Sequence, residues 1–232
     1  MAQHELQIGP VSCLVDTPVV PPTAVLILLH GYAMDAEHLA PLASAMGLPA
    51  TLYFPRGLLP TPIGGRSWWP LDEERRQASI AQGPRDLADE HPVSRAAARA
   101  ALLAVAKFTG QQHPGLPLML VGFSQGGMLA ADTLLQEDLP AQGLMLLSSS
   151  RIAFDEWQPR LGRIRGLPVL VAHGTQDPDL AFKAGEALRD VMQASGADVT
   201  WVPFEGGHEI PLTVWRSVKR LVLQIARRCH KA

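Results

Sequence analysis

The chain has 232 residues, 47% of them apolar, so it fits one large domain and can bury a substantial core. Its 20 lysine and arginine residues nearly balance 22 aspartate and glutamate residues, and a formal charge of -2 gives no reason to expect nucleic acid or an anionic membrane as a partner. The sequence shows no signal-peptide pattern and no apolar run long enough to cross a bilayer, so we expect a cytoplasmic protein without stable membrane insertion.

Short apolar runs alternate with helical patterns along the whole chain. Seven runs are rich in β-branched residues and read as strands: 11–16, 24–30, 50–54, 116–122, 143–148, 167–173 and 198–204. The middle runs are apolar throughout, which is typical of strands buried on both faces of a parallel sheet. Residues 94–108 and 212–228 instead repeat apolar side chains at helical spacing. We therefore predict a single α/β domain over residues 1–232, with a mostly parallel, doubly wound central sheet and helices on both faces.

Residues 55–92 interrupt this alternation with a long stretch punctuated by proline, glycine and clustered charges. A connection of this length is usually a binding loop or a lid. We predict that it lines a pocket or covers it, and a solvated surface loop is the alternative.

A serine stands between an apolar run and a helical pattern in the sequence LMLVGFSQGGMLAADTLL. Residues 122–126 match G-x-S-x-G, which places a serine on a sharp turn from strand to helix. Such a turn is strained, and small residues at both ends let neighbouring backbone pass close by. Because Met128, Ala131 and Leu135 then follow on one helical face, the pattern predicts that Ser124 is a nucleophile rather than part of a structural turn.

A serine hydroxyl is a poor nucleophile until a base takes its proton, so a histidine is needed. Among eight histidines, His30 and His173 directly end apolar runs, while His208 lies on a Gly-Gly loop after the last predicted strand. In folds that carry a serine on such a strand-to-helix turn, the catalytic residues follow one another along the chain in the order serine, acid, histidine. His208 is therefore the predicted base, and a loop histidine without a role is the alternative.

The acid that orients this histidine should lie between the serine and the histidine, on a loop at a strand end. The sequence VLVAHGTQDPDL offers Asp177 and Asp179 there. We expect Asp179 to cap the helix that starts at residue 180, which leaves Asp177 as the acid. Asp155 and Glu156 favour the start of another helix.

An acyl-transfer site also needs two backbone N–H donors aimed at the developing oxyanion. One should be the amide of Gln125, directly after the serine, and the other the amide of Tyr32, in the loop after an early strand. The phenol of Tyr32 lining the acyl pocket is an alternative that the residues leave open.

With these motifs in place, the chain resembles the phospholipase/carboxylesterase family of small α/β-hydrolases, which includes acyl-protein thioesterases and bacterial carboxylesterases. The resemblance is carried by LILLHGYAMD, RSWWPLD, LVGFSQGGMLA, PVLVAHGTQDPDL and EGGHEI. It implies that the family's serine, acid and histidine correspond to Ser124, Asp177 and His208, and its oxyanion donors to Tyr32 and Gln125.

Three departures from the family pattern lie where substrate is expected. The early loop has Tyr32 and Ala33 in place of the usual leucine-like residue and glycine, Trp68 is followed by a second tryptophan and a proline, and Arg151 stands after the fifth run. We expect Met34, Trp68, Trp69 and Arg151 to belong to the substrate pocket.

The resemblance implies a carboxylesterase-type serine hydrolase that cleaves short- or medium-chain esters through an acyl-serine intermediate. A lysophospholipase or acyl-thioesterase is the main alternative, and a non-catalytic binding module of the same fold is a remote one. We expect a small ester or thioester as partner, a monomer or homodimer, and no metal or other cofactor, because no H-E-x-x-H, cysteine cluster or Walker loop occurs. Cys13 and Cys229 should be free thiols.

Overall fold

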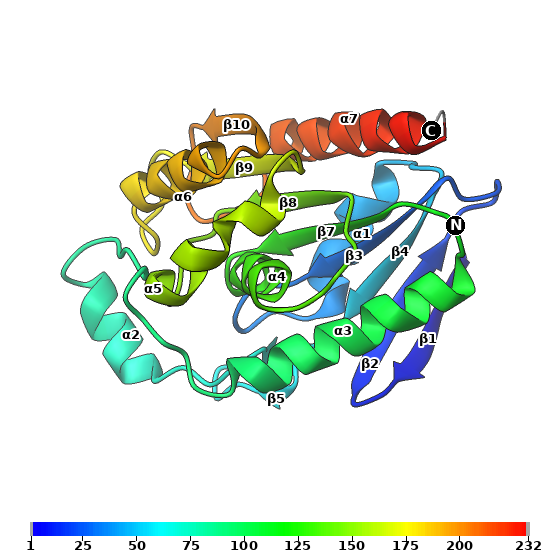
Figure 1. Ribbon diagram of the computed structural model, residues 1–232. Coiled ribbons are helices and arrows are strands. Elements are labelled where there is room, and N and C mark those ends of the chain that lie inside the picture. Colours follow the sequence, from blue (N-terminus) through cyan, green and yellow to red (C-terminus); the bar gives the residue numbers. More distant parts are fainter. Residues whose placement is uncertain (1, 231–232) are drawn as a thin grey trace.

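One eight-stranded sheet organises the structure, with the strand order β1-β2-β4-β3-β7-β8-β9-β10 (Figure 1). The computed structural model describes residues 2–230. The strands are Ala2–Ile8 (β1), Val11–Thr17 (β2), Ala24–Leu29 (β3), Ala50–Pro55 (β4), Leu118–Phe123 (β7), Gly143–Leu147 (β8), Pro168–Gly174 (β9) and Asp198–Phe204 (β10). β2 pairs antiparallel with β1 and with β4, and the remaining neighbours pair in parallel. The predicted α/β fold with a mostly parallel sheet is confirmed.

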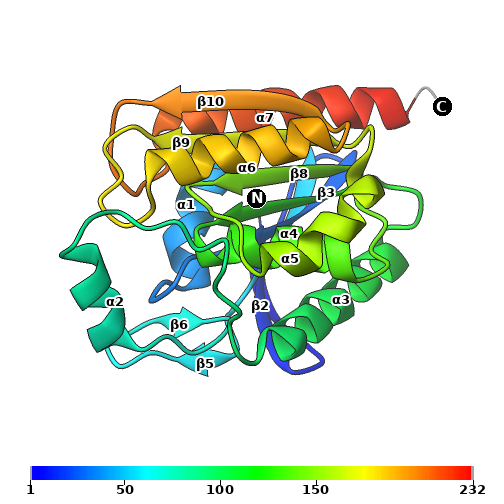
Figure 2. The ribbon, with the colours of Figure 1, turned by 60° about the vertical axis from the view of Figure 1, so that its left-hand side comes forward.

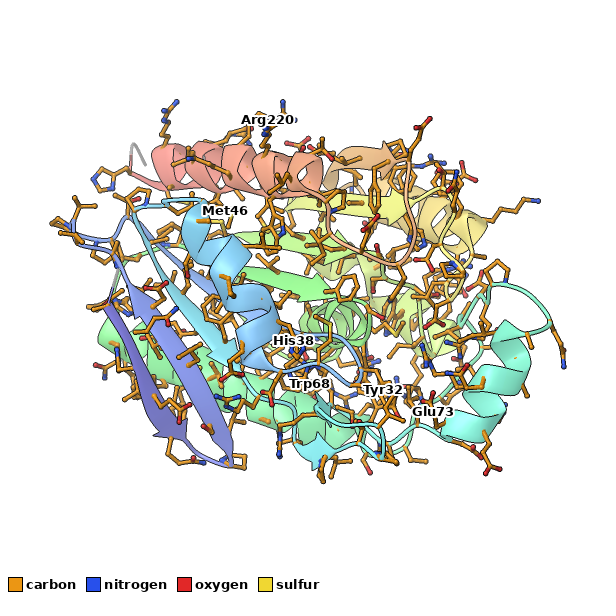
Figure 3. All side chains as sticks on the ribbon, turned by 180° about the vertical axis from the view of Figure 1, so that it is seen from behind. Tyr32, His38, Met46, Trp68, Glu73 and Arg220 are labelled. Carbon is orange, nitrogen blue, oxygen red and sulfur yellow. The ribbon has the colours of Figure 1, made fainter. Side chains whose placement is uncertain are left out.

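Helices cover both faces of this sheet. They are Ala36–Ala45 (α1), Glu73–Ile80 (α2), Arg95–Gln112 (α3), Gln125–Gln136 (α4), Phe154–Trp157 (α5), the 3-10 helix Gln158–Ile164 (η1), Phe182–Ala194 (α6) and Leu212–Cys229 (α7). Buried side chains of α3, α4 and α6 pack in one core cluster, and those of α1 and α7 pack in a second. Figure 3, seen from behind, shows α1 in front of the sheet, whereas Figure 1 shows α3 and α4 in front.

The central strands are buried on both faces, as their apolar sequences predict. All six residues of β3 are buried. Val25, Ile27 and Leu29 pack in the cluster with α3 and α4, whereas Leu26 and Leu28 pack in the cluster with α1 and α7. This alternation follows from the two-residue period of a strand, and it fixes the register of the parallel core.

A buried carboxylate joins three of the helices on one face. Asp132 of α4 is fully buried and accepts hydrogen bonds from Arg95 and Arg99 of α3, at 3.2 and 2.8 Å, and from the indole of Trp157 of α5, at 2.8 Å. The two arginines lie one helical turn apart, so both reach the same acceptor. This cluster holds the helix that follows Ser124 against its neighbours.

Candidate active site

The predicted functional residues gather at one edge of the sheet. Tyr32 follows β3, Ser124 follows β7, Asp177 follows β9 and His208 follows β10. The carboxyl ends of parallel strands share an edge, so all four residues reach the same side. In Figure 2, the arrowheads of β9 and β10 point toward the side of the molecule where α2 lies.

The structure brings Ser124, His208 and Asp177 into one hydrogen-bonded chain. Nε2 of His208 lies 2.9 Å from the Ser124 hydroxyl oxygen, and Nδ1 of His208 lies 2.7 Å from an Asp177 carboxylate oxygen. Ser124 is 9% exposed and Asp177 is 4% exposed. A serine, an imidazole and a carboxylate at these distances can pass a proton from hydroxyl to ring while the carboxylate holds the ring's orientation.

Ser124 lies in a strained turn, and the glycines on either side of it let neighbouring backbone pass close by. Its φ and ψ are 51° and -117°, and α4 begins at the next residue. A Cβ on Gly122 would lie 2.4 Å from the Gly126 carbonyl oxygen, and a Cβ on Gly126 would lie 2.2 Å from the Leu29 carbonyl oxygen. Both glycines are therefore required to bring α4 this close to β3 and β7, with its positive end behind the serine.

Asp177 is fixed by its own loop. Its second carboxylate oxygen accepts the backbone amides of Asp179 and Leu180, each at 2.9 Å. These two hydrogen bonds hold the carboxylate in place. The geometry thus favours Asp177 over Asp179 as the partner of His208.

The expected capping role of Asp179 is wrong. α6 begins at Phe182, after Ala181, and the Asp179 carboxylate instead binds the guanidinium groups of Arg76 and Arg85. Burial alone would raise the pKa of Asp179, but the two arginines outweigh it and the pKa is lowered. A competing attraction from two cations explains why the carboxylate turns away from the helix.

A cavity of about 610 Å³ lies beside the serine. Tyr32, Met34, Trp69, Gln125 and His208 all line it. No motif marks several further apolar lining residues as part of a pocket: Leu71, Leu87, Phe123, Met128, Ile152 and Leu180. Another hollow, of about 630 Å³, lies along α7 and contains none of the predicted site residues.

Two of the four expected pocket residues lie elsewhere. Trp68 is 1% exposed, and its ring stacks on His30 with 5.1 Å between centroids. Arg151 pairs with Asp86 at 2.6 Å and lies over the ring of Phe154 at 5.2 Å. Neither residue lines the cavity. Sequence cannot tell which of two adjacent tryptophans faces a pocket, and a carboxylate distant in sequence holds the arginine.

The segment 55–92 has more structure than a loop. It contains the short paired strands Leu59–Pro60 (β5) and Arg66–Ser67 (β6), and then α2. Isolated β-bridges join Arg66 to Met34 and Arg85 to Leu180, so the part that carries α2 is fastened at both ends. Residues from this segment supply much of the cavity wall, as predicted.

The loop after β3 positions the backbone of Tyr32. Gly31, Tyr32, Ala33 and Met34 form a turn in which the Met34 amide donates to the Gly31 carbonyl at 3.3 Å, and Ala33 has a φ of 58°. Across residues 2–230, the Tyr32 amide has no protein acceptor. Gln125 is the first residue of α4, and the first amides of a helix lack intrahelical partners. Both amides are available to a bound group.

Tyr32 is one of the residues that line the cavity. The Arg76 guanidinium lies 5.5 Å from the centre of its ring. Burial and the nearby Glu73 carboxylate raise the pKa of the Tyr32 phenol. The residue therefore offers the cavity both an amide and an aromatic ring.

Three further expectations concern the chain as a whole. Cys13 is buried and Cys229 is exposed, and both are free thiols, as predicted. Within residues 2–230, no helix is both long and apolar enough to span a membrane. In the same range, no three His, Cys, Asp or Glu side chains converge as metal ligands would.

The fold and the ordered serine, acid and histidine define the class of α/β-hydrolases. The sequence matches the Phospholipase/Carboxylesterase family over residues 12–224, and the chain belongs to that family.

The chain is also similar to individual proteins. The chain is 31% identical to acyl-protein thioesterase 1 of Neurospora crassa over 101 residues, which cover 40% of the chain and 41% of that relative. Its fold is similar to a carboxylesterase from Mesorhizobium loti, with a TM-score of 0.74, 21% identity and coverage of 95% and 98% of the two chains. It is also similar to acyl-protein thioesterase 2 of Zea mays, with a TM-score of 0.75, 18% identity and coverage of 92% and 98%.

Proposed function

We propose that this chain is a serine hydrolase that cleaves carboxylic esters of short to medium acyl chains through an acyl-serine intermediate. The observation that carries the proposal is the continuous contact from Ser124 through His208 to Asp177, at 2.9 and 2.7 Å. The family assignment supports a hydrolase of this kind.

In the first half-reaction, the Ser124 oxygen attacks the carbonyl carbon of the ester while Nε2 of His208 takes the hydroxyl proton. Asp177 stabilises the resulting imidazolium and keeps Nδ1 of His208 turned toward the Asp177 carboxylate. The tetrahedral intermediate then collapses, the bond to the alcohol breaks, and His208 returns its proton to the departing oxygen.

The amides of Tyr32 and Gln125 would bind the oxyanion of that intermediate. Loss of one such donor typically costs about 10²- to 10³-fold in turnover. Water then attacks the acyl-serine with His208 again as base, and the acid is released as Ser124 regains its proton. All steps use groups of this chain and one water molecule.

The cavity wall supports an uncharged acyl ester as substrate. Its charged side chains largely pair with one another: Arg75 contacts Glu90 at 3.2 Å, and Arg76 and Arg85 both bind Asp179. Trp69, Phe123 and other apolar residues form the part near Ser124. Such a wall suits a hydrocarbon chain and gives little attraction to a strongly anionic group.

An acyl-thioesterase is the second candidate, because the matching relative from Neurospora crassa is named an acyl-protein thioesterase. A lysophospholipase is compatible with the family description. Both need room for a long acyl chain. Turnover of matched oxygen and sulfur esters over increasing chain length separates them, and a sharp fall beyond medium length would count against both long-chain readings.

The hydrolytic proposal is tested with Ser124→Ala. This variant should lose ester hydrolysis and labelling by a serine-directed fluorophosphonate, whereas Ser217→Ala, on α7, should keep both. A wild-type protein that neither hydrolyses any ester nor becomes labelled would favour the non-catalytic binding module.

A further inference from the structure

His30 is a buried histidine that the proposed reaction does not use. It follows β3 directly, is 1% exposed, and precedes the turn that carries Tyr32. Its Nδ1 lies 2.7 Å from the carbonyl oxygen of Gly31, and its Nε2 accepts the backbone amide of Gly57 at 2.8 Å. Both ring nitrogens therefore have a backbone partner.

These two contacts define the state of the ring. An amide can only donate, so Nε2 must carry a lone pair, and the ring hydrogen must sit on Nδ1 and point to the Gly31 carbonyl. Burial lowers the pKa of His30 and so favours this neutral form. A charged ring would place a second hydrogen against the Gly57 amide.

The Gly31 carbonyl controls the direction of the Tyr32 amide. The two groups belong to one planar trans peptide, in which C=O and N–H point in opposite directions. His30 and the Met34 amide both hold the carbonyl oxygen, so the peptide cannot rotate freely. Its N–H is left on the other side, without a protein acceptor in the described part of the chain, in a residue that lines the cavity.

We propose that His30 is a positioning residue that orients the Tyr32 amide toward the oxyanion by holding the Gly31 carbonyl with one ring nitrogen and the Gly57 amide with the other. This inference rests on the proposed hydrolytic function. It assigns to His30 no contact with substrate.

The same network links both oxyanion donors to one support. The Trp68 indole donates to the His30 carbonyl at 2.9 Å and stacks on its ring. The Gln125 side chain accepts the Trp68 amide at 2.9 Å and donates to the Trp69 carbonyl at 3.1 Å. In the view of Figure 3, the label of Tyr32 lies between those of Trp68 and of Glu73 in α2. The stretch from Gly57 to Trp69 thus acts as a support for the oxyanion site as well as part of the cavity wall.

The test compares His30→Leu, which removes both ring contacts, with His30→Asn, whose side-chain amide can again donate to the Gly31 carbonyl. For His30→Leu we expect kcat to fall about ten- to a hundredfold, less than complete loss of a donor, with KM within about threefold of wild type. Affinity for an alkyl boronic acid, which forms a tetrahedral adduct on serine, should fall by a similar factor. His30→Asn should recover most of both losses.

One control separates positioning from a general effect on folding, and a second variant tests the contact of Trp68 with His30. His113 precedes β7, at the end of that strand away from Ser124, and its Nε2 lies 2.9 Å from the Tyr53 hydroxyl oxygen. His113→Leu removes this contact and should lower the melting temperature without changing kcat. Trp68→Phe keeps the stacking on His30 but removes the indole donor, and should give a smaller loss of kcat than His30→Leu.

The outcomes distinguish this inference from the function on which it rests. An active wild type whose His30→Leu variant keeps kcat and boronic-acid affinity would overturn the positioning role alone, as would an Asn variant no better than Leu. A wild type without hydrolysis or labelling would overturn both.

Discussion

Replacing Ser124 by glycine should make the protein more stable than replacing it by alanine. With a φ of 51° and a ψ of -117°, Ser124 adopts a backbone conformation that residues with a Cβ rarely populate. Glycine has no Cβ and tolerates it. Both substitutions remove the hydroxyl and its 2.9 Å contact with His208, so their difference isolates the cost of the turn itself.

The expected difference follows from two opposing terms. A residue held in a sparsely populated region costs about 1–3 kcal/mol, which glycine relieves. Glycine also gives the unfolded chain more freedom, which costs about 0.4–1 kcal/mol. We expect the glycine variant to exceed the alanine variant by about 0.5–2 kcal/mol in the free energy of unfolding, and each kcal/mol should raise the melting temperature by about 2–4 °C in a chain of this size.

Urea denaturation and thermal unfolding of the two variants, followed by circular dichroism, measure this difference. Both variants should be inactive. An alanine variant that is as stable as the glycine variant, or more stable, would refute the view that the turn stores strain in order to present the hydroxyl.

The remaining predictions concern stability and substrate binding. Asp132→Ala leaves two guanidinium groups and an indole without their buried acceptor and should lower the free energy of unfolding by about 3–5 kcal/mol, with kcat of the folded fraction unchanged; a loss under about 1 kcal/mol in urea denaturation would contradict the role of that carboxylate. Burial lowers the pKa values of His30 and His173, so the unfolded state binds more protons below pH 6.5, and stability should fall as the pH drops from about 6.5 to 5, with a limiting slope of about 1.4 kcal/mol per pH unit for each histidine. Urea titrations of Ser124→Ala at several pH values check this slope, and a flat profile in this interval would show that the rings are not held neutral. Asp179→Asn removes the charge that anchors α2 and should raise KM about tenfold with a smaller change in kcat, measured with a soluble ester; an unchanged KM would mean that the anchor does not shape the cavity.

Sequence patterns predicted the core of the fold because its signals are local. The uninterrupted apolar runs of β3, β7 and β8 match strands buried on both faces, and the stripe from Val214 to Ile225 matches the buried face of α7. In contrast, β1 was missed. Its residues are mostly exposed and polar, and it is a strand only because it pairs along its full length with β2.

The candidate site divides in the same way. Ser124, Asp177 and His208 could be selected because chain order and strand ends limit the choices, and the structure places them in contact. Asp179 was assigned to a helix cap because its arginine partners lie about a hundred residues earlier, on a segment without periodicity. The burial of Trp68 likewise depends on its contacts with His30 and Gln125, which no local pattern encodes.

The two β-bridges that flank α2 have a consequence for how selectivity can change. One fastens Arg66 to the turn that bears a proposed oxyanion donor, and the other fastens Arg85 beside the acid loop. Because these bridges lie on the hydrolytic apparatus itself, residues 70–84, which leave out Trp68 and Trp69, can be exchanged while the apparatus keeps its shape, provided that position 76 keeps its cation. A graft of the corresponding stretch from a relative would then transfer preference for a substrate without rebuilding the chemistry.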